Sequence, residues 1–109
     1  MTNQYDSVKA WFDVAPARFQ PSRAGNMNTV VQFDISGEGG GKWYVTVKDK
    51  TLTVSEGEAE DPAVTVTMAA GDWLKMVNRQ ADVGSLYMSG RLQVKGSIYL
   101  AQQFAYLFA

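Results

Sequence analysis

The chain of 109 residues has neither cysteine nor histidine, so few of its side chains are suited to chemistry. Without cysteine there is no disulfide, no thiolate nucleophile and no thiolate-bound zinc. Without histidine, the commonest metal ligand and the commonest general base are also missing. An enzyme would have to use carboxylates, lysine, tyrosine or serine alone. We therefore predict that the chain is not an enzyme and has no catalytic residue, metal ligand or cofactor.

A glycine-rich segment, residues 37–42, ends in Lys42 and invites comparison with a phosphate-binding loop. Such a loop needs serine or threonine after the lysine and a helix next. Here Trp43 follows, and an alternating pattern typical of a strand begins. The glycines are better explained as a hairpin turn.

An acidic cluster lies in residues 56–62, with Glu56, Glu58, Glu60 and Asp61. Weak calcium binding is one interpretation, but the spacing is not that of an EF-hand. Carboxylate acid–base chemistry needs one acid in an apolar pocket, and no such pocket is evident. We expect a solvated loop.

Arg18 and Arg23 flank a break in the helical pattern near Pro16. Either arginine could meet a lipid carboxylate or phosphate through a charge-assisted hydrogen bond. The alternative is that both are solvated. Arg23 is kept as a candidate head-group contact.

Charge and hydropathy exclude several classes of protein. Ten basic residues balance eleven acidic ones, without the basic stripe of a nucleic-acid-binding protein or a block of like charges that marks a membrane surface. No apolar run approaches the ~20 residues of a membrane-spanning helix. The polar residues 1–6 do not resemble a signal peptide, and residues 106–109 are not a peroxisomal signal. The expected location is the cytoplasm.

Periodicity predicts the elements. A first helix is expected in residues 5–14, with Val8, Trp11 and Phe12 on one face. Pro16 interrupts it, and residues 13–21 are expected to form a break before a short second helical piece, which carries Phe19 and Met27 and ends at Gly25-Asn26. Period-two alternation predicts a three-stranded antiparallel meander in residues 30–36, 43–48 and 51–55, with a tight turn at Asp49-Lys50.

The second half of the chain shows the same kinds of helix and strand pattern. A fourth strand is expected at residues 64–68, then a helix capped by Gly71-Asp72, a short helical piece at 82–87, a fifth strand at 91–95 and a final helix from about residue 96 to the end. The helical link between the last two strands is long enough for a parallel, right-handed crossover.

In every expected strand, apolar residues alternate with polar ones, and Tyr44 is the main exception. One face of the sheet is therefore wet, and helices must cover the other. We predict a single domain over residues 1–109, of α+β class, with a two-layer arrangement of a five-stranded, mostly antiparallel sheet and helices on one face.

Three segments carry a family resemblance. They are residues 88–96 (Met-Ser-Gly-Arg-Leu-Gln-Val-Lys-Gly), Gly41-Lys42-Trp43, and residues 61–68 followed by Asp72-Trp73-Leu74. In their order and spacing along the chain, these three segments resemble the sterol carrier protein type-two family, and the resemblance covers roughly residues 30–104. That resemblance implies an apolar tunnel between sheet and helices that holds sterols, fatty acids, acyl-CoA thioesters or phospholipids. The animal peroxisomal forms of that family end in a targeting tripeptide, which this chain lacks. Residues 1–29 match poorly, and because that region and the C-terminal helix vary most with the ligand in the family, the resemblance leaves the choice of lipid open.

The candidate lipid contacts are mostly large apolar residues of the expected helices. They are Trp11, Phe12, Phe19, Arg23, Trp73, Met76, Val77, Leu86, Met88, Leu100, Phe104, Leu107 and Phe108. The alternative is that these side chains simply fill the core. An empty cavity costs about 24 cal/mol per Å³, which a bound acyl chain offsets at about 0.8 kcal/mol per buried methylene. Leu107 and Phe108 either anchor the last helix or form a mobile lid.

The leading hypothesis is a protein that carries or presents a lipophilic molecule and makes transient contact with a membrane or a partner enzyme. The second is a non-catalytic accessory or interaction subunit of a lipid- or quinone-related enzyme complex, with Tyr44 and Tyr99 in the contact. The third is a small enzyme that uses tyrosine or a carboxylate on a hydrophobic substrate.

Overall fold

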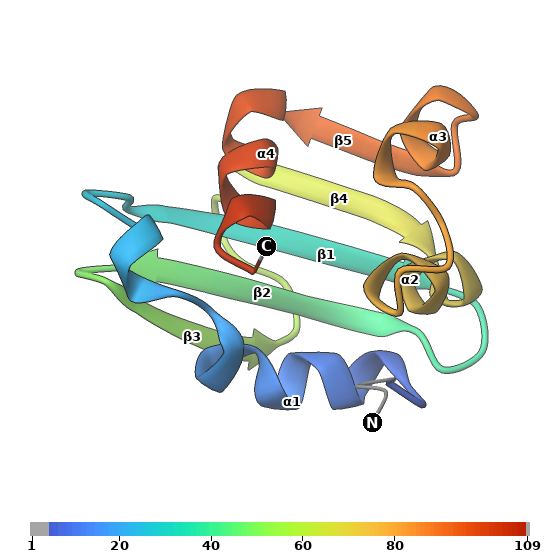
Figure 1. The fold of residues 1–109 in the computed structure, drawn as a ribbon, viewed down its shortest axis with the longest axis horizontal. Helices are drawn as coiled ribbons and strands as arrows, with labels where there is room; N and C mark the ends of the chain where they lie inside the picture. Colours follow the sequence, from blue (N-terminus) through green and yellow to red (C-terminus); the bar gives the residue numbers. More distant parts are fainter. Residues whose placement is uncertain (1–4, 109) are drawn as a thin grey trace.

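The computed structural model describes residues 5–108, which form a five-stranded sheet covered by helices (Figure 1). The helices are α1 (Val8–Arg18), the short 3-10 helix η1 (Pro21–Arg23), α2 (Ala70–Val77), α3 (Val83–Met88) and α4 (Ile98–Tyr106). The strands are β1 (Thr29–Ser36), β2 (Gly41–Lys48), β3 (Thr51–Glu56), β4 (Val64–Ala69) and β5 (Leu92–Gly96). The two-layer α+β prediction is confirmed.

The sheet has the order β3-β2-β1-β4-β5. Its one parallel pair is β1–β4; the other three pairs are antiparallel. The predicted parallel crossover between the fourth and fifth strands is wrong, because Met68 pairs with Leu92 and Val64 with Gly96 in antiparallel register. The reason is length: α2 has eight residues and α3 six, so they rise only about 12 and 9 Å. The chain therefore enters β5 beside the end of β4.

The inner face of the sheet follows the predicted alternation. Its buried residues are Val31, Phe33, Ile35, Trp43, Val45, Val47, Leu52, Val64, Val66, Met68 and Leu92. Because their side chains point to one face, the helices bury them in a single continuous core.

The outer face is not uniformly wet, contrary to the prediction, because Gln32 is only 4% exposed. Its Nε2 donates hydrogen bonds to the carbonyls of Gly57 (3.1 Å) and Trp43 (3.3 Å), and its Oε1 accepts one from the N–H of Ala59 (2.8 Å). The loop between β3 and β4 thus crosses the outer face, and Gln32 fastens it there. A buried side-chain amide needs such partners.

Helix α1 continues through Pro16 to Arg18, so the predicted break is wrong. Proline in a helix interior costs about 3 kcal/mol, but each large side chain on the buried face contributes about 1.5–3 kcal/mol. Trp11 and Phe12 both lie on that face. Their burial outweighs the loss of one hydrogen bond near the helix end.

The predicted second helical piece is only the three-residue η1. Phe19 lies in extended backbone at the end of α1, and both it and Met27 pack half-buried against the core. Gly25, with φ of +55°, ends this segment as expected.

The predicted cap of α2 at Gly71-Asp72 is wrong, because the helix already begins at Ala70, and its N-cap, Ala69, offers no side-chain hydrogen bond. Asp72 lies in the first turn instead, where a negative charge is favourable. The tight turn at Asp49-Lys50 is confirmed; both residues have positive φ, as a two-residue hairpin of type I′ requires.

We predict that Gln32→Ala lowers the free energy of unfolding by about 1–3 kcal/mol, because it leaves the N–H of Ala59 and the carbonyl of Gly57 without their partner. Gln93→Ala, an identical change on the exposed side of β5, should stay within about 0.5 kcal/mol. Urea denaturation measures both. Equal losses in the two variants would contradict the fastening role of Gln32.

Candidate ligand-binding site

An aromatic cluster joins the helices to the sheet, and Phe12 lies at its centre. The Phe12 ring is stacked on Trp43 of β2, with centroids 4.7 Å apart, and on Trp73 of α2, at 5.3 Å. It also makes edge contacts with Trp11 and with Phe33 of β1. Such pairs contribute about 0.5–1.5 kcal/mol each beyond their buried area. Phe12 therefore fixes the position of α1 over the sheet.

The same cluster extends to α4. Phe104 contacts Phe33 and Phe108, and Phe108 contacts Trp11. Leu107 is completely buried, and its carbonyl accepts a hydrogen bond from the N–H of Gln20 (2.9 Å). The end of α4 is thus packed down in the structure, which favours the anchoring interpretation of Leu107 and Phe108.

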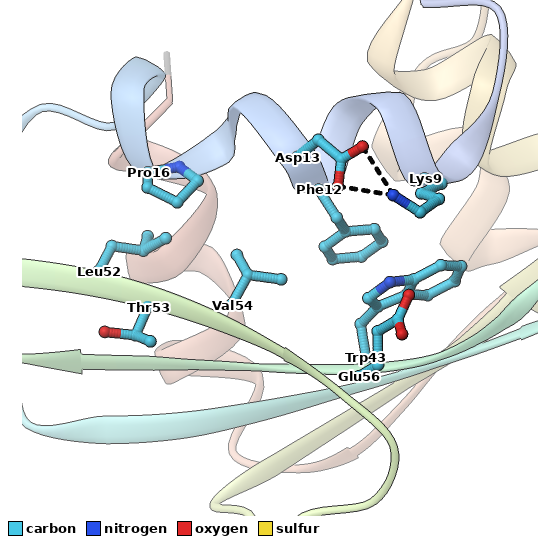
Figure 2. A pocket seen from close by; sticks show the side chains of 9 residues that line it. All are labelled: Lys9, Phe12, Asp13, Pro16, Trp43, Leu52, Thr53, Val54 and Glu56. Atoms are coloured by element: carbon cyan, nitrogen blue, oxygen red, sulfur yellow. Dashed lines mark hydrogen bonds and ion pairs between the residues drawn. The ribbon is translucent and has the colours of Figure 1, made fainter.

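A groove of about 550 Å³, open to solvent, lies between α1 and the strands β2 and β3 (Figure 2). Its lining residues are Lys9, Phe12, Asp13, Pro16, Trp43, Leu52, Thr53, Val54 and Glu56. In Figure 2 the Phe12, Pro16, Leu52 and Val54 side chains project into the space between helix and strands. The volume lies in the usual range of ligand pockets, about 300–1,000 Å³.

The groove has a charged rim. Lys9 Nζ donates to both carboxylate oxygens of Asp13, at 2.9 and 3.1 Å. This hydrogen bond and the charge of Asp13 raise the pKa of Lys9, and Glu56 adds a smaller effect in the same direction. Because the pair is exposed, it stabilises the fold little. Two carboxylates against one ammonium leave the rim with an excess of negative charge.

The predicted contact residues fall into three groups. Trp11, Phe12, Trp73, Leu86, Phe104 and Leu107 are buried; Phe19, Arg23, Met76, Val77, Leu100 and Phe108 are half-buried; and Met88 is 83% exposed. Met88 therefore lies outside the interior in which the sequence prediction placed it. Of the thirteen, only Phe12 lines the groove.

Arg23 contacts protein rather than an open site. Its Nη1 donates to the carbonyl of Tyr106 (3.1 Å), and its guanidinium lies 4.6 Å from the centre of the Tyr106 ring. Arg18 lies 5.8 Å from the centre of the Tyr5 ring. In the structure, Arg23 connects η1 to α4.

The predicted site residues did not include Trp43, Leu52 or Val54, which line the groove. The alternation of apolar and polar residues had placed all three side chains on the inner face of the sheet, and this pattern was the signal that the sequence offered for them. The path of α1 determines which residues of the inner face border the groove. The sequence prediction ended the helix before Pro16, so it did not place α1 beside β3.

Within residues 5–108, no group of three or more Asp, Glu, His or Cys side chains is arranged to hold a metal ion. Over the same range, no helix combines the length and apolar character needed to cross a membrane. The oxygen of Thr29 and the indole N–H of Trp73 are buried without a hydrogen-bond partner among these residues.

The family model described as the SCP-2 sterol transfer family matches residues 12–109. Hydroxysteroid dehydrogenase-like protein 2 of Mus musculus is 42% identical over 73 residues, which cover 66% of this chain and 15% of that protein. This chain thus spans about a seventh of the length of that curated relative.

Two solved structures are similar over most of the chain. Palmitated SCP2L2 from Aedes aegypti superimposes with a TM-score of 0.78 and 27% identity, covering 94% of both chains. A structure described as UbiJ-SCP2, a ubiquinone synthesis protein, has a TM-score of 0.65 and 25% identity, covering 81% of this chain and 75% of that one.

We expect Phe12→Ala to lower the free energy of unfolding by about 3–5 kcal/mol, because it removes the central ring of the cluster. Phe19→Ala, the same change at a half-buried position, should cost clearly less. Thermal and urea denaturation compare them. Similar losses in the two variants would show that the stacks on Trp43 and Trp73 do not fix α1.

Proposed function

Because the chain belongs to the SCP-2 sterol transfer family, we propose that it binds, and carries or presents, one lipophilic molecule. The apolar part of that molecule lies in the groove between α1 and the β2–β3 edge. The observation that carries this proposal is an open groove of about 550 Å³, whose lining combines apolar side chains with polar ones; they are Phe12, Pro16, Trp43, Leu52 and Val54, and Lys9, Asp13, Thr53 and Glu56.

Burial of apolar surface supplies the driving force. Each methylene group fully removed from water contributes about 0.8 kcal/mol, and in a groove that is open to solvent each contributes part of that gain before the costs of association. Phe12 and Trp43 are stacked on each other, so the apolar contacts with an extended chain come mainly from Pro16, Leu52 and Val54. An acyl chain is favoured, since the similar Aedes aegypti protein was solved in a palmitated form.

The rim charges bear on the head group. Asp13 and Glu56 oppose a carboxylate or phosphate at the mouth of the groove, and Lys9 already donates to Asp13. A neutral hydroxyl or ester at this position meets no such repulsion. We infer that the groove accepts neutral lipids more readily than anionic lipids of the same chain length.

An accessory role is the second candidate. The chain spans 15% of its dehydrogenase-like relative, and the similar UbiJ-SCP2 structure is described as a ubiquinone synthesis protein. Both favour a module that holds a ligand for a partner enzyme. Affinity purification from the native host separates the candidates, because an accessory subunit returns one stoichiometric enzyme partner and a free carrier returns none.

The groove is tested by filling it. We expect Val54→Trp to weaken the binding of a fluorescent fatty acid or sterol by about tenfold or more, because the indole occupies the ligand volume. Val94→Trp is the matched control: Val94 is also half-buried on the inner face of an edge strand, but on β5 at the opposite edge. Circular dichroism checks that both variants fold.

If Val94→Trp alone lost binding, the ligand would bind at the β5 edge of the sheet, and the assignment of the groove would be refuted. Absence of saturable binding by delipidated, folded wild-type protein would refute the proposed function itself.

The rim is tested by removing a charge. We predict that Glu56→Gln strengthens the binding of a long-chain fatty acid by about two- to fivefold at low salt, because one repulsive carboxylate is removed. The affinity for the fatty alcohol of equal length should not change. A titration at neutral pH measures both ligands, and an equal gain for acid and alcohol would contradict the electrostatic account.

A further inference from the structure

Helix α3 presents apolar side chains to solvent that the core does not explain. Of its six residues, only Leu86 is buried, while Val83, Tyr87 and Met88 are exposed. Met88 reaches 83% exposure, the highest among the large apolar residues described. The helix lies at a corner of the molecule, beyond one end of β5 (Figure 1).

The chain around α3 is basic, although the protein as a whole is not. Residues 73–97 contain four basic residues and one acidic residue, whereas the rest of the chain contains six basic and ten acidic residues. The one acid, Asp82, caps α3: its Oδ2 accepts hydrogen bonds from the N–H (2.9 Å) and hydroxyl (3.2 Å) of Ser85. The segment thus carries a net charge of +3 in a chain of net charge −1.

Three of these basic residues flank the helix. Lys75 and Arg79 belong to the end of α2 and the link to α3, where the N–H of Gln80 bonds to the carbonyl of Lys75 (2.7 Å). Arg91 follows α3, and its N–H bonds to the carbonyl of Leu86 (2.9 Å). All three are exposed, and among residues 5–108 none of them forms an ion pair.

Arg79 occupies a position where glycine is usual. It follows the C-cap Asn78, has φ of +60°, and its N–H bonds to the carbonyl of Met76 (3.1 Å). With the bond from Gln80, this is a Schellman ending, whose left-handed residue is most often glycine. A strained non-glycine residue points to a use for its side chain. An exposed positive charge beside an apolar helix gives it one.

We propose that α3 and its flanking basic residues form a docking surface for a bilayer that contains anionic phospholipid. Val83, Tyr87 and Met88 enter the interface between head groups and acyl chains, while Lys75, Arg79 and Arg91 pair with phosphates. Met88 is flexible and polarizable, which suits an irregular lipid surface. The groove lies along β3, at the other edge of the sheet from β5, so docking leaves it uncovered.

The first test compares Arg79→Gly with Lys50→Gly in the full chain. Lys50 has φ of +59° in the turn between β2 and β3, so each variant removes one positive charge and relieves one strained residue. Both should raise the melting temperature by a few degrees. Only Arg79→Gly should weaken co-sedimentation with phosphatidylcholine vesicles containing about 30% phosphatidylglycerol, by about fivefold.

The second test removes apolar surface. Met88→Ser should weaken binding to the same vesicles by about tenfold, whereas Tyr99→Ser, at a side chain on α4 that is 67% exposed, should not change it. Both variants should bind fatty acid in solution as the wild type does, which separates failure of docking from failure of the proposed groove.

The proposal is overturned by any of three results: wild-type binding that is equal on vesicles without phosphatidylglycerol, equal losses in Arg79→Gly and Lys50→Gly, or no loss in Met88→Ser. Wild-type binding to an acidic protein surface but not to vesicles would also overturn it.

Discussion

The stacking of Phe12 between the indoles of Trp43 and Trp73 is the contact on which the rest of the arrangement depends. It joins α1, β2 and α2 through one side chain. Because Phe12 holds α1 close to the sheet at the Trp43 end, and the helix continues past Leu52 and Val54 of β3, the space between helix and edge strand remains open as a groove. A groove bounded by packed aromatic rings is largely preformed, so ligand binding costs little free energy for ordering its side chains.

The strands were predictable because their residues alternate with a period of two, and that local rule determined which side chains lie on the inner face. The path of the chain was not predictable from local rules. The helix passes through Pro16 because tertiary burial of Trp11 and Phe12 outweighs the propensity of proline. Likewise, the burial of Gln32 depends on a loop that crosses the sheet 25 residues later in the chain.

The candidate site was predicted only in part for the same reason. Most of the large rings predicted as lipid contacts on the helices are buried in the core, and the groove is lined by Phe12 together with inner-face residues of β2 and β3. The proposed docking surface was invisible in the sequence, which has no block of basic residues. Lys75 lies in α2, Arg79 in the link to α3 and Arg91 just after α3, so the sequence spreads these residues over two short helices and the turns beside them.

The central claim is that a lipophilic guest lies against α1, β2 and β3. Isotope-filtered NMR of labelled protein with an unlabelled long-chain lipid measures this contact most directly. The account predicts intermolecular NOEs from the lipid chain to the methyl groups of Leu52 and Val54 and to the ring of Phe12. NOEs to the methyl groups of Leu86 and Leu92, without any to Leu52 or Val54, would contradict it.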